Sequence, residues 1–286
     1  MKLMDINEFS KPEEEIARSK RVFGLLYGII TGLTYAIASY AIDGTILSQS
    51  HAYLPWTMLI SGAILCATAC GIFGWLTSYL ESSLTGALFW LLAALLLAGI
   101  TVALPMYIMP FVATQFDPAL ASLMIYERNV EFLSRFGVTL AWILPIVLIV
   151  GVTQVPILEP AVFATSFFGK MKPFLFSIVI ISLGSMMIDD VINKQLRSAI
   201  VSLDKTIQFV VDNKGNDNVD KVLSREMRAR SLTGVLDEVS ETRYLIVAGF
   251  DESLGDLDIL VKFEDTWAAC EVLYSQPLVC KPVPAK

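Results

Sequence analysis

The chain has 286 residues, of which 55% are hydrophobic and only 17% are charged, and its formal net charge is −7. Charged residues are absent from five stretches of 16 to 26 residues: Val22–Ile42, Trp56–Leu80, Leu84–Met109, Val138–Leu158 and Pro173–Ile188. Uncharged apolar runs of this length are typical of bilayer-spanning helices, and they exclude a single soluble globule or a disordered chain. We therefore predict a membrane α-helical bundle (five transmembrane helices) with a small C-terminal α+β soluble domain.

Residues 1–21 form a polar segment, which we predict to be cytoplasmic, before the membrane domain of residues 22–190. In the first two spans, small residues recur at four-residue spacing, at Gly24, Gly28, Gly32, Gly62, Cys66, Cys70 and Gly74. Small side chains let helix backbones approach closely, which favours van der Waals packing within lipid. We predict that the first two spans pack together through these residues, with homodimerisation as the alternative.

The distribution of basic residues indicates the orientation, because Lys and Arg are enriched in cytoplasmic loops. With the N-terminus inside, seven Lys and Arg residues lie on the inner side and two in the outer loops. Counting Lys194, Arg197 and Lys205 after the fifth span narrows the difference to seven against five. The chain is thus predicted to be an integral protein of the plasma (inner) membrane, with a cytoplasmic N-terminus and an extracytoplasmic C-terminal domain.

The outer loop between the third and fourth spans contains Asp117-Pro118, a helix-start signal, followed by apolar residues at helical spacing. We predict an amphipathic helix over 118–135. Pro145 and Pro156 are expected to bend or interrupt the fourth span. That span also contains Gln154, one of the few polar residues within the charge-free spans and one on which flux through a transporter could depend.

Three acidic residues, Asp43, Asp189 and Asp190, flank the outer ends of the first and fifth spans. In the predicted orientation they would form an acidic rim that is either simply solvated or able to attract cations. The bends expected in the third and fourth spans are the transporter-like feature of the membrane domain.

The C-terminal domain, residues 191–286, begins with a helix whose apolar residues recur at spacings of four and three: Leu196, Ile200, Leu203, Ile207 and Val210. A second helix is expected from Asp217 to about Ser240. Three strands should follow, in residues 243–250, 257–263 and 267–274, because β-formers dominate the first run and apolar residues alternate in the second. The acidic residues 251–258 are expected to include a loop between the first two strands.

Two cysteines of the C-terminal domain, Cys270 and Cys280, are ten residues apart around an expected turn. This separation is compatible with a disulfide, which would place the domain in an oxidising compartment, and two free thiols are the alternative. The membrane cysteines Cys66 and Cys70 lack evident partners for a metal, so we predict no metal, no cofactor and no catalytic residues.

The motifs argue against several kinds of function. His51 is the only histidine, and we interpret it as a solvated loop or interfacial residue. The sequence contains no nucleophile elbow, zinc-protease motif or phosphate-binding loop. A pI of about 4.8 argues against nucleic acid as a partner. We predict a non-enzymatic multi-pass protein in the lipid bilayer whose outer domain binds a protein partner or ligand, as an accessory subunit or receptor, or self-associates. A small-solute or ion transporter or channel is the second hypothesis, and an atypical membrane enzyme acting on lipid is the third.

Overall fold

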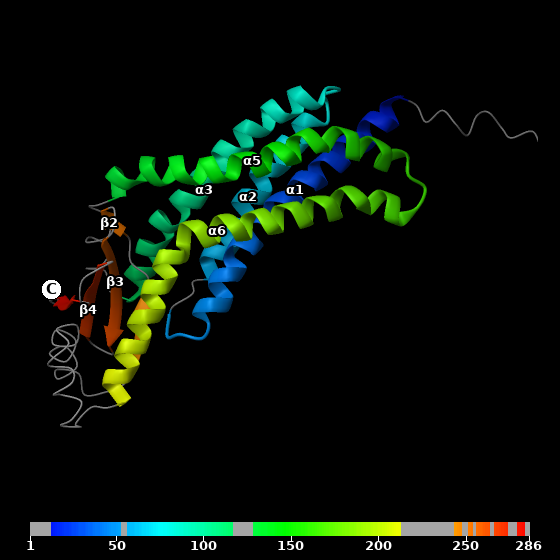
Figure 1. Cartoon of the computed structure of the whole chain (residues 1–286). Coiled ribbons are helices and arrows are strands. Elements are labelled where there is room, and N and C mark those ends of the chain that lie inside the picture. Colours follow the sequence, from blue (N-terminus) through cyan, green and yellow to red (C-terminus); the bar gives the residue numbers. More distant parts are fainter. Residues whose placement is uncertain are drawn as a thin grey trace, which may run out of the picture. The chain divides into compact units, whose positions relative to one another are not determined.

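The computed structural model describes residues 13–52, 56–116, 128–212, 243–247, 251–253, 256–263, 266–273 and 279–283. Its helices, coloured along the sequence in Figure 1, are α1 (Glu13–Leu47), α2 (Trp56–Thr77), α3 (Ser83–Phe116), α5 (Arg128–Phe163) and α6 (Phe167–Asp212). Its strands are β1 (Tyr244–Val247), β2 (Asp251–Ser253), β3 (Asp256–Phe263), β4 (Thr266–Leu273) and β5 (Val279–Val283). The described chain is therefore mostly helical with a small sheet, as the sequence predicts.

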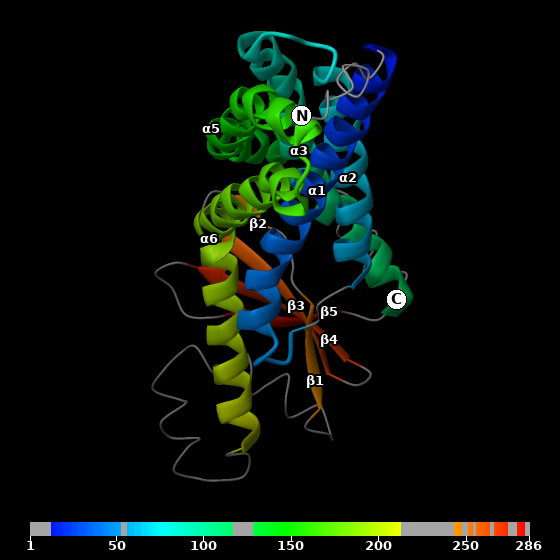
Figure 2. The ribbon, with the colours of Figure 1, turned by 90° about the vertical axis from the view of Figure 1, so that its right-hand side faces the viewer.

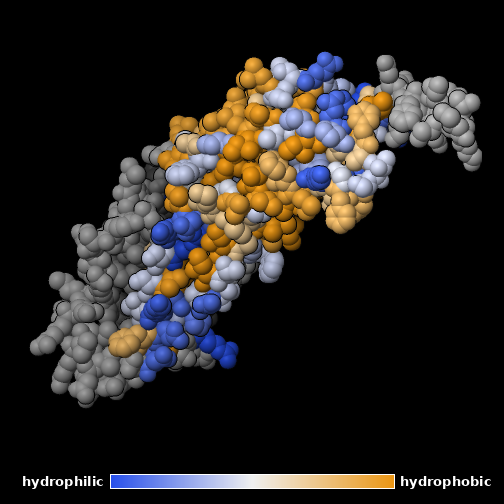
Figure 3. Space-filling view, turned by 45° about the vertical axis from the view of Figure 1, so that its right-hand side comes forward, coloured by the Kyte–Doolittle hydropathy of each residue, from blue (hydrophilic) through white to orange (hydrophobic). Residues whose placement is uncertain are grey.

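Each of the five helices contains a segment long and apolar enough to cross a membrane: Glu15–Leu47, Trp56–Thr77, Ser83–Leu104, Arg135–Phe163 and Phe167–Val191. Many of their large apolar side chains are exposed, and on α3 they recur every four residues, at Leu84, Leu88, Leu92 and Leu96. Figure 3 shows hydrophobic side chains over much of the visible surface of the long helices. Contiguous apolar surface of this extent is unfavourable in water, so these features indicate an integral membrane protein.

The described residues belong to two compact units. The first unit lies within Met1–Tyr40, Met58–Leu104 and Phe136–Ile188, and the second lies within Ala41–Thr57, Pro105–Arg135 and Asp189–Lys286. The segments 41–57 and 105–135, which the sequence analysis placed in the membrane domain, thus group with the C-terminal residues. Each of the five described helices contributes residues to both units, although α2 contributes only Trp56 and Thr57 to the second.

Close packing of α1 against α2 characterises the first unit. A β-carbon added at Gly24, Gly28 or Gly32 of α1 would collide with the backbone carbonyl oxygen of Gly74, Cys70 or Cys66, respectively, on α2. The two backbones therefore touch along three successive helical turns, a distance that only small residues allow. Gly62 is less constrained, since a β-carbon there would lie 3.2 Å from the Leu104 side chain.

The second unit is built on a five-stranded antiparallel sheet in the order β1-β3-β4-β5, with β2 also paired to β3. The C-terminal half of α6 lies along this sheet (Figure 2), and Ile200, Leu203 and Ile207 pack into one core with residues of β1, β3 and β4. The spacing of these apolar residues predicted the buried stripe. The strands β1, β3 and β4 also confirm the predicted runs, with small differences at their ends.

Two strands were not predicted. β2 forms at Asp251–Ser253, within the segment interpreted as an acidic loop, and pairs irregularly with the start of β3. β5 contains Pro282, a residue that usually argues against a strand, and it forms at the sheet edge beside β4. A proline is tolerated there because an edge strand needs hydrogen bonds on one side only.

The structure differs from one helix prediction and leaves two others wholly or partly outside the described residues. The prolines Pro145 and Pro156 lie inside α5 without interrupting it. Residues 128–135 are the first turns of that same helix, whereas 117–127, the start of the predicted amphipathic helix, lie outside the described residues. The predicted helix at 217–240 also lies outside them.

Candidate functional site

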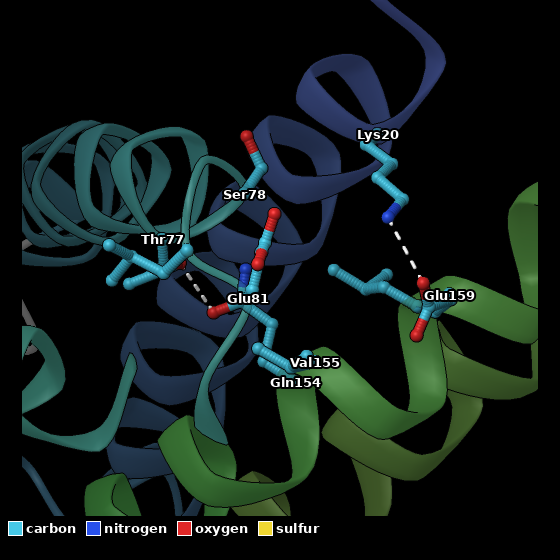
Figure 4. Close-up of a pocket in the computed structure, with 9 residues that line it drawn as sticks. Lys20, Thr77, Ser78, Glu81, Gln154, Val155 and Glu159 are labelled. Atoms are coloured by element: carbon cyan, nitrogen blue, oxygen red, sulfur yellow. Dashed lines mark hydrogen bonds and ion pairs between the residues drawn. The ribbon is translucent and has the colours of Figure 1, made fainter. Parts of the chain in front are cut away.

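A pocket of about 290 Å³ opens in the first unit, where α1, α2, the 78–82 turn and α5 meet. Figure 4 shows its labelled polar side chains. The lining residues are Lys20, Thr77, Ser78, Leu80, Glu81, Gln154, Val155, Leu158 and Glu159. Ser78 to Glu81 lie between two candidate spans, and Lys20 and Glu159 lie near the ends of two others. The pocket therefore combines an apolar wall with charged groups at the level where spans end.

Gln154 forms the polar base of this pocket and is 1% exposed. Its Oε1 accepts hydrogen bonds from Thr77 Oγ1 at 2.6 Å and from Trp90 Nε1 at 2.5 Å, and its Nε2 donates to the Gly74 carbonyl at 3.1 Å. These three bonds join α5 to α2 and α3. A primary amide carries two N–H donors. The second amide proton of Gln154 has no acceptor among the described residues.

Charged side chains occupy the opening of the pocket. Lys20 Nζ lies 3.1 Å from Glu159 Oε1, so these two charges neutralise each other. Glu81 is exposed and has no ion-pair partner in the described part of the chain. The described charges of the pocket therefore sum to one negative charge, which Glu81 carries.

A second polar cluster lies in the second unit and joins the segment after α1 to α6 and β1. Asp204 Oδ1 accepts hydrogen bonds from the His51 backbone N–H at 3.2 Å and from the Tyr244 hydroxyl at 2.9 Å, and lies 3.0 Å from His51 Nδ1. The rings of His51 and Tyr244 lie 4.5 Å apart. The His51 carbonyl also accepts a hydrogen bond from the Ile246 N–H at 2.9 Å, beside a bridge between Ala52 and Ile246.

The contacts of this cluster indicate a structural role in the second unit rather than a catalytic one. Asp204 is 6% exposed, and a buried carboxylate is favourable only when hydrogen bonds compensate its desolvation. Burial, together with the hydrogen bond to Asp204 and the negative charges of Asp204 and Asp212, raises the pKa of Tyr244. Among the described residues, no group of three or more His, Cys, Asp or Glu side chains is arranged to hold a metal ion.

The structure brings together Cys270 of β4 and Cys280 of β5, which are directly opposite in the strand register. Their sulfur atoms lie 2.10 Å apart, at disulfide distance. Cys66 and Cys70 are buried free thiols in the contact between α1 and α2.

The acidic residues of the predicted rim have different surroundings. Asp189 is buried and pairs with Arg197, and its Oδ1 accepts a hydrogen bond from Asn193 Nδ2 at 2.5 Å. Asp190 is exposed, and its Oδ1 lies 3.1 Å from Nη2 of the same Arg197. Arg197 thus contacts both acids, but its single positive charge can balance only one of them. Asp43 belongs to α1, and its side chain lies outside the described part of the structure.

The residues that form the pocket and the His51–Asp204–Tyr244 cluster are not among the site residues predicted from the sequence. His51 was interpreted as a solvated loop residue, yet it contacts Asp204, which is 153 residues away. Gln154 offered a better signal, since an isolated amide inside an apolar span must find partners on neighbouring helices. No signal in the sequence pairs Lys20 with Glu159, because both are ordinary charged residues near span ends.

No protein family model, curated protein or solved structure matches this chain. A functional hypothesis therefore depends on the chain's own features, above all the pocket of the first unit and the sheet of the second.

Proposed function

We propose that this protein is a five-span integral membrane protein whose second unit is an extracytoplasmic domain that binds a protein partner. In this proposal the N-terminus is cytoplasmic, and the protein acts as an accessory subunit or receptor of the plasma (inner) membrane. The observation that carries it is a sheet with its own core and a cysteine pair at disulfide distance, in a chain with five membrane-compatible helices.

The orientation is supported by the polar groups at one end of the first unit. Lys20 and Glu159 form an ion pair, so the N-terminal part of α1 lies beside the C-terminal part of α5. The Arg21 guanidinium lies 4.7 Å from the centre of the Tyr79 ring. Basic and aromatic residues concentrate at membrane–water interfaces, and basic residues favour the cytoplasmic side.

The compartment of the second unit is supported by Cys270 and Cys280. Disulfides persist in oxidising compartments and are rare in the cytosol. A bond between these residues would link β5 to β4 covalently, and β5 is a short strand at the sheet edge. A domain exposed to an extracytoplasmic environment gains more from such a link than a cytosolic domain does.

The backbone of β5 supports the choice of a protein partner. In the described part of the sheet, β5 pairs with β4 on one side and with no strand on the other. An edge strand offers backbone N–H and C=O groups on its outer side, of which Pro282 supplies only a C=O, and an extended segment of another protein can add there as a further strand. We therefore place the contact at Val279–Val283.

A topology and cross-linking experiment tests this proposal. In intact cells, a membrane-impermeant maleimide is expected to label a cysteine introduced at Arg243, an exposed residue beside β1, from outside, because the native cysteines are buried. Labelling only after the inner face is exposed would overturn the orientation. A photo-crosslinker at position 281 of β5 is expected to give a discrete protein adduct, while one at Lys205, exposed on α6, gives none. Equal adducts from both positions, or none, would contradict partner binding at β5.

A second function, the passage of a small solute, is favoured by one observation, the polar pocket built on the buried Gln154. Transporters bind solutes at polar groups within otherwise apolar spans. Flux into proteoliposomes that responds to substitution of Gln154 or of the Asp189–Asp190 pair would support this function. Liposomes with no flux for the solutes tested would count against it.

A further inference from the structure

The pocket of the first unit supports an inference that does not depend on partner binding by the second unit. We propose that this pocket binds the ammonium group of a small amino alcohol, with Glu81 as the counter-ion. The same chemistry occurs in a free amino alcohol and in the headgroup of an aminophospholipid, and the pocket recognises the part that the two share.

The charges of the pocket select a cation. Lys20 and Glu159 neutralise each other at 3.1 Å, which leaves Glu81 as the uncompensated charge among the described lining residues. The hydroxyl protons are also engaged, since Ser78 donates to the Trp75 carbonyl and Thr77 donates to Gln154. The hydroxyl oxygens and the carboxylate therefore offer lone pairs, and an ammonium group supplies three donors to them.

Gln154 selects an oxygen on the same ligand. Its carbonyl accepts two hydrogen bonds, and one amide proton is held by Gly74, which leaves the second amide proton for an acceptor in the pocket. A buried N–H donor without a partner is unfavourable, so a ligand oxygen that satisfies it gains affinity. In Figure 4, Glu81 and Gln154 lie in the middle of the pocket, between Thr77 and the Lys20–Glu159 pair.

The remaining wall suits a short carbon linker. Leu80, Val155 and Leu158 give the pocket an apolar side. A volume of about 290 Å³ exceeds the share of a water molecule in the liquid, about 30 Å³, severalfold. Because Ser78–Glu81 connect two candidate spans, the pocket lies at the depth of lipid headgroups, so a lipid and a soluble amine can both reach it.

Calorimetric titration of the purified full-length chain with ethanolamine tests the proposal. Saturable binding is expected, and it should weaken about tenfold in Glu81→Gln because a charge-assisted hydrogen bond is lost. Glu81 is exposed in a turn, so this variant retains the fold. The matched control is Glu15→Gln, an exposed acid of α1 outside the pocket, which should bind as the wild type does. Ethylene glycol, which lacks the ammonium group, should bind at least tenfold more weakly.

Lipid nanodiscs distinguish the two sources of the ammonium group. If the headgroup is the ligand, wild-type protein in nanodiscs that contain phosphatidylethanolamine retains that lipid in native mass spectra, and Glu81→Gln loses it. If a free amine is the ligand, ethanolamine binds equally well in phosphatidylethanolamine and phosphatidylcholine nanodiscs. The proposal would be overturned if Glu81→Gln bound ethanolamine as tightly as the wild type, or if ethylene glycol bound as tightly as ethanolamine. It would also be overturned if the wild type neither bound ethanolamine nor retained the lipid.

Discussion

Replacement of Gln154 by Leu tests whether a single amide holds three helices of the first unit together. The substitution keeps the approximate volume of the side chain and removes its bonds to Thr77, Trp90 and Gly74. The Phe73 and Gly74 carbonyls of its own helix also lie within hydrogen-bond distance of Thr77 Oγ1, so the single hydroxyl proton has another acceptor in the variant and Thr77 loses little. Trp90 is fully buried, and its Nε1 has no other acceptor among the described residues.

These contacts set the size of the effect. Interhelical hydrogen bonds in membrane proteins average about 0.6 kcal/mol, so the two bonds that the variant cannot replace, to Trp90 and Gly74, contribute about 1 kcal/mol. A buried indole N–H without an acceptor adds about 1 to 3 kcal/mol. We therefore expect Gln154→Leu to lower the free energy of unfolding by about 2 to 4 kcal/mol.

Circular dichroism during SDS titration of the detergent-solubilised protein measures this change. Thr68→Ala is the control, because Thr68 donates only to the Ile64 carbonyl of its own helix, and it should change the free energy of unfolding by less than about 0.5 kcal/mol. If Gln154→Leu also stays within about 0.5 kcal/mol of the wild type, the amide does not join these helices and the reasoning fails.

Three further substitutions test other contacts. Gly28→Ala should destabilise the first unit by at least about 1 to 3 kcal/mol in the same titration, because the added β-carbon meets backbone of α2, whereas Gly137→Ala, with nothing within 4 Å, should not. Tyr244 has a raised pKa, so the folded state holds its proton more tightly than the unfolded state, whose pKa is about 10. The contribution of protonated Tyr244 to the stability of the folded state is therefore complete below about pH 10 and is lost as the pH rises further. The thermal stability of Tyr244→Phe should fall less than that of the wild type between about pH 9 and 11, and an identical pH profile would refute this. Cys270→Ser should cost about 2 to 3 kcal/mol if a bond to Cys280 closes the ten-residue separation, and the loss should match that caused by reductant alone.

The parts of the fold that could be predicted from the sequence are those that depend only on residues close together along the chain. An uncharged run of sufficient length marks a membrane-compatible helix wherever its neighbours lie, because each helix satisfies its own backbone hydrogen bonds. Alternation at Leu257–Phe263 and the stripe at Ile200, Leu203 and Ile207 likewise depend on neighbouring residues only. β5 was missed because its formation depends on register with β4 rather than on its own residues.

The candidate sites depended on the tertiary structure. Gln154 meets Trp90 across 64 residues and Thr77 across 77, and His51 meets Asp204 across 153. Such partners cannot be identified from one sequence, because many polar residues could satisfy the same hydrogen-bonding need. The sequence by itself determined that five membrane-compatible helices and three of the five described strands form, and in which segments of the chain they lie, but not where each helix begins and ends. Only the packing of the helices decided that Glu81, Gln154 and the Lys20–Glu159 pair share one pocket, because long-range pairing follows from the sum of many weak contacts.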